Sequence, residues 1–169
     1  MEALPYKIST LIYLRDRQGR LLLLSRRKAP NQGLWSPIGG KLEMGAGESP
    51  HEAAAREVRE EAGLAVTPAD LHLFALIAEK NYEDRCHWLM FLFDCRRELD
   101  ALPPPIDEGA FAFFREDQID GLALPETDRK ALWPLYFKAR GDFTALRADC
   151  RGGRPLEVHA DEVMRLRDR

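Results

Sequence analysis

Residues 40–64 read GKLEMGAGESPHEAAAREVREEAGL, and this stretch carries the strongest local signals in the chain. Ser49 suits the position that caps a helix, a proline follows it at the first helical position, and Glu52 completes a capping box. Gly63 stands where a left-handed residue ends a helix. The stretch therefore predicts a helix from Ser49 to Ala62, preceded by a glycine-rich loop.

Three glutamates of this predicted helix fall on one face. Glu57, Glu60 and Glu61 stand at i, i+3 and i+4, and each residue turns by about 100° around a helix axis, so the three carboxylates share a side. Like charges at this spacing destabilise a helix by about 0.2–0.5 kcal/mol per pair. Such a face is either a solvated acidic surface or a site for a hard divalent cation, which prefers several carboxylate oxygens. The helix alone leaves both interpretations open.

The wider spacing resembles the Nudix box, the signature of the Nudix hydrolase family. From Glu48 onward the match is in register: a glutamate, seven residues, Arg-Glu, an apolar residue, any residue, Glu-Glu, any residue, glycine and an apolar residue. One departure is that seven residues separate Gly40 from Glu48, more than is usual in the family, so residues 45–47 look like a two-residue expansion of the loop. The strand order and the loop 28–35 resemble the MutT-like branch. The resemblance implies an α/β fold, the Nudix α/β/α sandwich with a mixed β-sheet.

The resemblance also implies roles for the box residues. It implies a metal ion that is bound by the carboxylates of Glu57, Glu60 and Glu61 and by the backbone carbonyl of Gly40. The implied ion is Mg²⁺, with Mn²⁺ as the alternative. Arg56 joins the three glutamates in the catalytic set by orienting a carboxylate through a charged hydrogen bond; a surface ladder of ion pairs is the other interpretation. In the MutT-like branch a further carboxylate outside the box often acts as a base or as an extra metal ligand, and the candidate here is Glu108. The other interpretation is that Glu108 is an ordinary exposed acid in a loop.

Residues outside the box are candidates for binding the substrate. Arg26, Arg27 and Lys41 flank the predicted site and are candidates for a phosphate contact, since a net charge of −3 does not attract an anion by itself. The alternative is that these basic side chains are only solvated. Trp35 is a candidate for stacking on a base, although aromatic residues at such spacings are usually core residues. By resemblance, Asp128 falls where related proteins place residues that contact the base.

The rest of the chain is predicted to be rich in strands. Apolar, β-compatible runs predict strands at 8–14, 20–25, 35–42, 71–78, 88–95, 110–114, 143–150 and 156–159. The first two and the last two of these strands are predicted to form hairpins. A second helix is predicted at 125–139, where Pro134 interrupts the pattern, and three consecutive prolines predict an extended connection at 102–106. We expect one domain, 1–169, with a C-terminal hairpin and tail at 143–169.

Composition excludes several function classes. With 25 basic and 28 acidic residues in 169, the surface as a whole does not attract a nucleic acid polymer or an acidic membrane. The three cysteines are far apart, which is atypical of a disulfide framework or a zinc site. No signal-peptide pattern and no apolar run of the ~18 residues of a membrane span occur, so a cytoplasmic protein is expected. The sequence leaves the oligomeric state open; a homodimer is compatible with the resemblance because dimers are frequent in the family.

The expected function is metal-dependent hydrolysis of a diphosphate linkage, an acid anhydride, in a nucleoside diphosphate derivative. The leading hypothesis is cleavage of a nucleoside triphosphate to the monophosphate and pyrophosphate, in housekeeping of the nucleotide pool. Alternative small-molecule substrates are ADP-ribose, a dinucleoside polyphosphate and a nucleotide sugar. A non-catalytic nucleotide-binding sensor is a different class of protein, and such relatives usually lose box carboxylates that are all present here.

Overall fold

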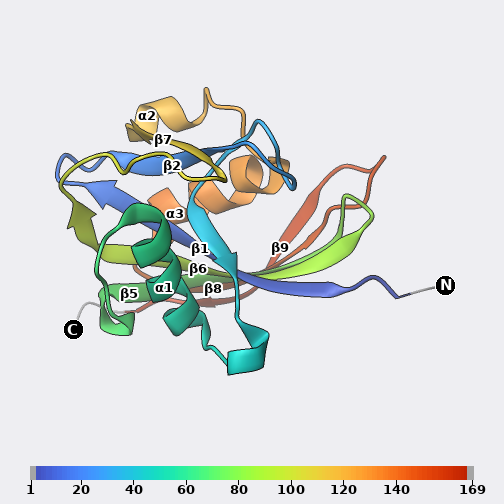
Figure 1. Ribbon diagram of the computed structural model, residues 1–169. Helices are drawn as coiled ribbons and strands as arrows, with labels where there is room; N and C mark the ends of the chain where they lie inside the picture. The colour runs from blue at the N-terminus through green and yellow to red at the C-terminus, as the bar shows by residue number, and fades with distance from the viewer. Residues whose placement is uncertain (1–2, 167–169) are drawn as a thin grey trace.

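A mixed nine-stranded sheet runs through the computed structural model, which describes residues 3–166 (Figure 1). The strands are β1 (Tyr6–Asp16), β2 (Leu21–Arg26), β3 (Trp35–Ser36), β4 (Ile38–Lys41), β5 (Leu71–Tyr82), β6 (Cys86–Leu99), β7 (Gly109–Phe114), β8 (Phe143–Asp149) and β9 (Glu157–Met164). The order is β3-β2-β1-β6-β5-β8-β9, with β4 also paired to β1 and β7 to β2. The pairs β1–β6 and β5–β8 are parallel and the other pairs are antiparallel, which confirms the predicted mixed sheet.

Within residues 3–166, three α-helices and three short helical turns accompany the strands. The α-helices are α1 (Pro50–Ala62), α2 (Glu116–Ile119) and α3 (Trp133–Ala139). The short turns are the 3-10 turns η1 (Met44–Ala46) and η2 (Pro68–Asp70) and the π-helical turn η3 (Asp128–Leu132), which leads directly into α3. No helix of the described residues is long and apolar enough to cross a membrane.

The first predicted hairpin is regular only at its turn. The register of β1 and β2 is set by a single pair, Arg15 opposite Leu21. Beyond it, residues 9–12 of β1 pair with β4, whereas β2 pairs with β7 over its whole length. The predicted hairpin is therefore confirmed at its turn, and beyond the turn β1 and β2 pair with different strands. The predicted strand at 35–42 is likewise two short strands, separated at Pro37, which has no N–H to donate.

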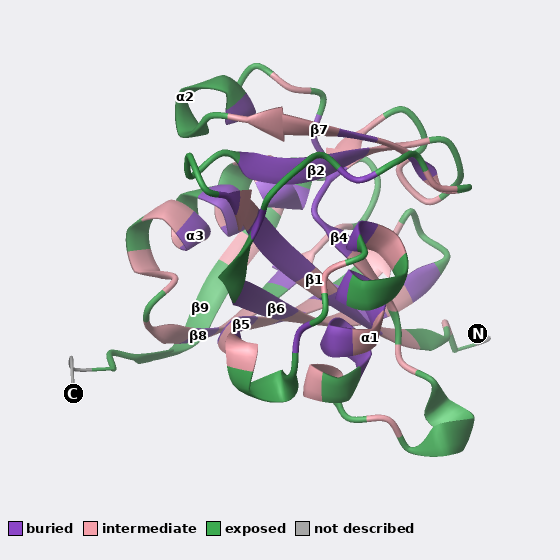
Figure 2. Ribbon diagram, turned by 60° about the vertical axis from the view of Figure 1, so that its left-hand side comes forward, coloured by how far each residue is buried: buried purple, intermediate pink, exposed green. Residues whose placement is uncertain are grey.

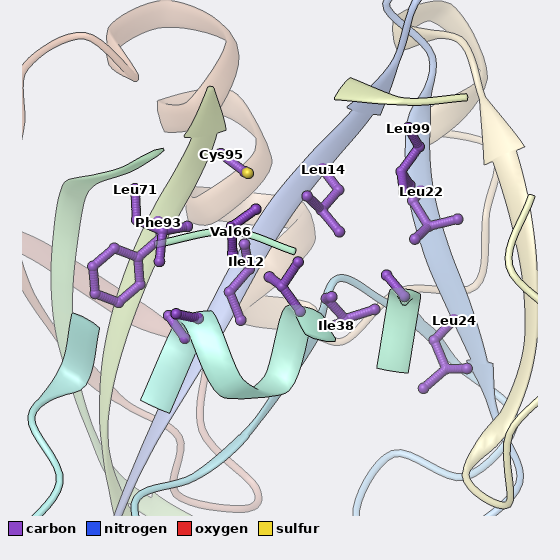
Figure 3. Packing of buried hydrophobic residues seen from close by; sticks show 14 of the residues in the cluster. Ile12, Leu14, Leu22, Leu24, Ile38, Val66, Leu71, Phe93, Cys95 and Leu99 are labelled. Carbon is purple, nitrogen blue, oxygen red and sulfur yellow. The ribbon is translucent and has the colours of Figure 1, made fainter. Parts of the chain in front are cut away.

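The inner strands are apolar on both faces, because successive side chains point to opposite sides of a sheet. On one face Ile12 of β1, Leu22 of β2 and Phe93 of β6 belong to one core cluster, which also includes side chains of α1 (Figure 3). The contacting side chains of α1 include Ala54 and Val58, both fully buried. Burying the small alanine side holds the helix close to the sheet, so its opposite, acidic side keeps a fixed position.

The other face is covered by α3. Tyr13, Leu23 and Leu92 alternate in sequence with the residues of the first face and pack against Trp133 and Tyr136. The rings of Tyr13 and Tyr136 stack with centroids 4.6 Å apart. With helices on both faces, the molecule has the predicted α/β/α arrangement, and the buried strands lie between exposed outer helix surfaces (Figure 2).

The ends of α1 agree with the sequence signals. The hydroxyl of Ser49 accepts a hydrogen bond from the backbone N–H of Glu52 at 3.2 Å, and the Glu52 carboxylate accepts from the Ser49 N–H at 2.8 Å. Gly63 has a left-handed φ of 68°, and its N–H donates to the carbonyl of Arg59. The predicted start and end of this helix are confirmed.

The other predicted elements are present with shifted bounds. The helical stretch expected at 125–139 is η3 followed by α3, and Pro134 is the second residue of α3, directly after the π-helical turn. The C-terminal hairpin is β8 and β9, and its second strand extends five residues beyond the predicted end at His159 to Met164.

Candidate active site

Glycines of β4 bring the backbone against the acidic side of α1. A Cβ atom added at Gly40 would lie 2.1 Å from Oε1 of Glu57, closer than any side chain can approach. The neighbouring Gly39 has the same constraint on its other side, where a Cβ would lie 1.9 Å from the carbonyl oxygen of Thr10. Only glycine fits at position 39, and a side chain at position 40 would displace the carboxylate of Glu57, so the backbone of Gly40 lies directly against this carboxylate.

Arg56 ties the box loop to the helix. Its Nε and Nη2 donate to the two carboxylate oxygens of Glu48 at 2.7 and 2.9 Å, and its Nη1 donates to Oε1 of Glu57 at 2.8 Å. A further bond of 3.2 Å reaches the carbonyl of Lys41, and Nη1 is 3.4 Å from Glu60. Hydrogen bonds from Arg56 lower the pKa of Glu48, which stays ionised. The arginine therefore orients both carboxylates, and its ion pair with Glu60 is the weaker part of its role.

The glycine-rich loop before α1 is solvent-exposed and does not disturb the helix. Its residues form the turn η1, which ends at Gly47 in a left-handed conformation with φ 65°. The carboxylate of Glu48 accepts a hydrogen bond from the N–H of Glu43 at 2.8 Å and thereby closes the loop. Glu48 thus holds the loop in place, while Glu57 and Glu61 face the interior.

Glu57 and Glu61 form a partly desolvated pair of carboxyl groups. Glu57 is buried, and Oε2 of Glu61 is a buried oxygen with no hydrogen-bond partner among the described residues. Burial, followed by the charges of Glu57 and Glu108, raises the pKa of Glu61 to about 8. Burial also raises the pKa of Glu57, although Arg56 opposes this. Arg56 offsets the charge of Glu57, but Glu61 has no salt bridge among residues 3–166, and a bound cation would supply the positive charge beside it.

The donor set fits a hexacoordinate divalent cation that keeps open positions. The donors are hard oxygens of residues that line one cavity: the unpartnered oxygen of Glu61, the carboxylate of Glu57 and the backbone carbonyl of Gly40. No group of three or more His, Cys, Asp or Glu side chains among residues 3–166 is arranged to enclose a metal ion by itself. Mg²⁺ is usually bound in this incomplete manner, with water and substrate phosphates as the remaining ligands.

A cavity of about 350 Å³ extends from these carboxylates across the sheet. Several of the predicted site residues line it: Arg26, Gly40, Lys41, Glu57, Glu61, Glu108 and Asp128. Arg56 lies behind Glu57 rather than on the cavity wall. The sequence thus selected residues that the fold brings together from five separate segments.

Besides Arg56, three predicted residues lie outside the lining of this cavity in the described structure. Glu60 and Arg27 are exposed, and the backbone N–H of Arg27 donates to the carbonyl of Glu108. Trp35 packs edge to face on Phe114, with centroids 4.9 Å apart, in the core on the α3 side. An aromatic side chain beside a buried sheet face is drawn into the core, which was the alternative interpretation of Trp35.

Several cavity residues carried no recognisable signal in the sequence. They are Asn31, Glu79, Tyr82 and Trp88. The hydroxyl of Tyr82 donates to the side-chain oxygen of Asn31, which joins the turn after β2 to the end of β5. Glu79 lies in β5 and is 2% exposed, and burial raises its pKa to about 8. An acidic residue directly after the apolar run 71–78 was the one available hint, and by itself it was equally compatible with the end of a strand.

Comparison with known proteins places this arrangement among characterised folds. Residues 5–138 match the family model described as NUDIX domain. A MutT protein from Bacillus halodurans superposes with a TM-score of 0.74 at 21% identity, covering 92% of this chain and 97% of that one. A MutT protein from Methanosarcina mazei gives 0.67 at 26% identity, covering 82% and 99%. The NUDIX domain of NrtR from Shewanella oneidensis, solved with ADP ribose, gives 0.63 at 16% identity, covering 82% and 89%.

One similarity is confined to part of a larger protein. A stretch of 65 residues is 49% identical to a segment of the octanoyltransferase of Myxococcus xanthus. It covers 37% of this chain and 17% of that protein, so the chain spans about a sixth of that relative's length. The name octanoyltransferase describes the whole of that longer protein, of which this similarity covers 17%.

Proposed function

Since this chain belongs to the NUDIX domain family, we propose that it hydrolyses the diphosphate linkage of a nucleoside diphosphate derivative with the help of Mg²⁺. The proposed substrate is a nucleoside triphosphate, cleaved to the monophosphate and pyrophosphate. The observation that carries the proposal is that Glu57 lies against the backbone of Gly40 and that Glu61, which has an unpartnered buried oxygen, lines the same cavity. Mn²⁺ is the alternative ion, and a homodimer and a cytoplasmic location stay predictions.

The proposed roles follow from the contacts. Glu57, Glu61 and the carbonyl of Gly40 would hold the divalent cation, which when bound neutralises diphosphate charge and makes water a better nucleophile. Arg56 keeps Glu57 in position through its 2.8 Å hydrogen bond. The carboxylate of Glu57 is thus fixed in position before the substrate enters, which reduces the entropy lost on reaching the transition state.

Residues on the cavity wall account for the remaining chemistry. Arg26 and Lys41 line the cavity near the carboxylates and supply positive charge to phosphate oxygens. Glu108 is near enough to Glu61 for its charge to raise the pKa of that residue. In the proposed reaction a water oxygen attacks phosphorus, the bond from phosphorus to the bridging oxygen breaks, and Glu108 accepts the proton of the water.

A product analysis tests the proposal. The protein is incubated with Mg²⁺ and nucleoside triphosphates, ADP-ribose, dinucleoside polyphosphates or nucleotide sugars, and the products are separated by chromatography. We expect a nucleoside monophosphate and pyrophosphate from a triphosphate, no reaction in the presence of a chelator, and loss of at least about 99% of the turnover in Glu61→Gln with a normal fold. Cleavage of ADP-ribose alone would identify the alternative substrate. Nucleotide binding without cleavage of any compound would replace the proposal with a sensor.

A further inference from the structure

Arg26 lies in the cavity without an acidic partner. It lines the cavity together with Glu61 and Glu108, and its charge opposes the rise in the pKa of Glu61. Within residues 3–166, however, Arg26 forms no salt bridge, and its one side-chain hydrogen bond runs from Nε to the backbone carbonyl of Pro30, at 2.7 Å. A guanidinium group has five N–H donors, so the donors on both Nη atoms are left for a ligand.

The carbonyl of Pro30 determines the direction of this guanidinium group. A free arginine side chain beside two carboxylates would be drawn into ion pairs with them. It would then occupy oxygens proposed to bind the cation and would have fewer donors for a phosphate group. The hydrogen bond from Nε fixes one edge of the planar group, so both Nη atoms keep a constant direction. Arg26 is therefore ready to contact an anion as long as Pro30 stays in place.

The loop that carries Pro30 is held by its own backbone only at its ends. The N–H of Gly33 donates to the carbonyl of Arg26 at 2.8 Å and closes the loop. Among the described residues, 28–30 make no hydrogen bond from backbone to backbone. The position of the Pro30 carbonyl therefore depends on the next residue in the chain, Asn31.

Asn31 is fixed from the end of β5 by Tyr82. The φ of Asn31 is 63°, in the left-handed region that asparagine adopts more readily than most residues. Its side-chain oxygen accepts a hydrogen bond from the hydroxyl of Tyr82. Burial raises the pKa of Tyr82 above its ordinary value, so the phenol keeps its proton and can donate it. This contact joins the central sheet to the residue that follows Pro30.

Asn31 and Tyr82 border two cavities at once. Besides the main cavity they line a second one of about 270 Å³, whose walls include Glu83 after β5 and Arg154 after β8. Open space on both sides means that these two side chains have fewer packed neighbours than core residues have. Packing therefore contributes less to holding Asn31, and the hydrogen bond from the tyrosine hydroxyl contributes more.

We propose that Tyr82 is a positioning residue for the phosphate contact made by Arg26. Its hydroxyl fixes Asn31, and the adjacent carbonyl of Pro30 then fixes the guanidinium group. This inference rests on the proposed function, because it concerns the phosphate groups of that substrate. Without the tyrosine hydroxyl, Arg26 would have to be ordered when the phosphate binds. Immobilising one long side chain on binding lowers affinity by about threefold to tenfold.

Binding of inorganic pyrophosphate tests this without a catalytic step. Its dissociation constant is measured by calorimetry on the full chain with Mg²⁺. Tyr82→Phe removes the hydroxyl and retains the ring, so we expect binding to weaken by about threefold to tenfold. Arg26→Gln removes the contact itself and should weaken binding further. In the double variant Tyr82→Phe should add nothing to Arg26→Gln, because no arginine is left to position. Weakening by the same factor in both backgrounds, or unchanged affinity in Tyr82→Phe, would overturn the inference.

Two further variants separate positioning from a general loss of stability. Tyr136→Phe is the matched control: the hydroxyl of Tyr136 donates to Asp94 at 3.0 Å in the core under α3, away from the cavity. This variant also loses a buried tyrosine hydrogen bond, and it should bind pyrophosphate as the unmodified protein does. Asn31→Gly keeps the left-handed backbone and removes the acceptor, so it should reproduce the effect of Tyr82→Phe. Equal weakening in Tyr136→Phe would attribute the effect to lost stability and contradict the positioning role.

The outcome is distinguishable from failure of the proposed function. In turnover of a triphosphate, Tyr82→Phe should raise KM by about threefold to tenfold and leave kcat within about twofold, because the phosphate contact is made before and during the reaction. Metal-dependent cleavage with equal effects of Tyr82→Phe in both Arg26 backgrounds would retain the hydrolase and remove only the positioning role. Absence of cleavage, with the predicted non-additive binding of pyrophosphate, would retain the positioning role and remove the hydrolase.

Discussion

Replacing Glu79 with glutamine is expected to change how stability depends on pH. In the folded chain burial raises the pKa of Glu79 from its ordinary 4.5 to about 8. At about 1.4 kcal/mol per pH unit, such a change corresponds to about 5 kcal/mol of unfolding free energy. Part of it is repulsion from Asp128, which protonation of either acid relieves, so we expect on the order of 3 kcal/mol.

The direction in which the free energy of unfolding changes with pH follows from the state that binds the proton more tightly. A carboxyl group with a raised pKa binds its proton more tightly in the folded state than in the unfolded state, so this proton favours folding fully below pH 4.5. The benefit is lost as the pH rises through about 8. Glu79→Gln has no such proton to lose. The variant and the unmodified protein should therefore differ little near pH 4.5, and the variant should be the more stable by on the order of 3 kcal/mol at pH 9.

Urea denaturation followed by tryptophan fluorescence at pH 5, 7 and 9 measures the difference. Because other titrating groups are common to both proteins, their contributions cancel in the comparison. Glu126→Gln, at an exposed position, serves as the control and should follow the unmodified protein at every pH. Parallel curves of unfolding free energy against pH for Glu79→Gln and the unmodified protein would refute the claim that Glu79 is protonated in the fold.

Three further predictions concern the metal-binding end of the cavity. Gly40→Ala should reduce turnover at least tenfold, because its Cβ would lie 2.1 Å from the Glu57 carboxylate, whereas Gly45→Ala, with no atom within 4 Å of its Cβ, should keep full turnover in the same steady-state assay. Arg56→Lys keeps the charge but loses the two-pronged bond to Glu48, so the melting temperature measured by calorimetry should fall by several degrees and turnover should fall with it; unchanged values would show that charge alone suffices. Removing divalent cations with a chelator should abolish turnover while the far-ultraviolet circular dichroism spectrum stays the same, since the two core clusters do not include the proposed ligands; loss of the spectrum would instead indicate a structural metal.

Local interactions made the part of the site that lies on α1 predictable from the sequence. The capping box at Ser49, the stop at Gly63 and the common face of the glutamates depend only on residues within one or two turns of a helix. The resemblance then supplied roles for the box that spacing alone left open. The contacts of Arg56 with Glu48 and Glu57 agree with those expectations because all three residues lie within or next to the same helix.

Long-range packing decided what the sequence could not specify. Whether an aromatic residue such as Trp35 enters the core or a pocket depends on which strand covers it, and β7 provides Phe114 as its neighbour. The divergence of β1 from β2 depends on competing partners that come later in the chain.

The contrast between what the sequence and what the tertiary structure determined is clearest for two pairs of acids, Glu57 with Glu61 and Glu79 with Asp128. The sequence by itself determined the box glutamates, because helical periodicity fixes how residues three and four apart are related. Only the tertiary structure placed Glu79 beside Asp128, because a strand and a helix distant in sequence meet there and exclude water from both carboxyl groups. Desolvation is a property of the assembled interior, so no local pattern records it.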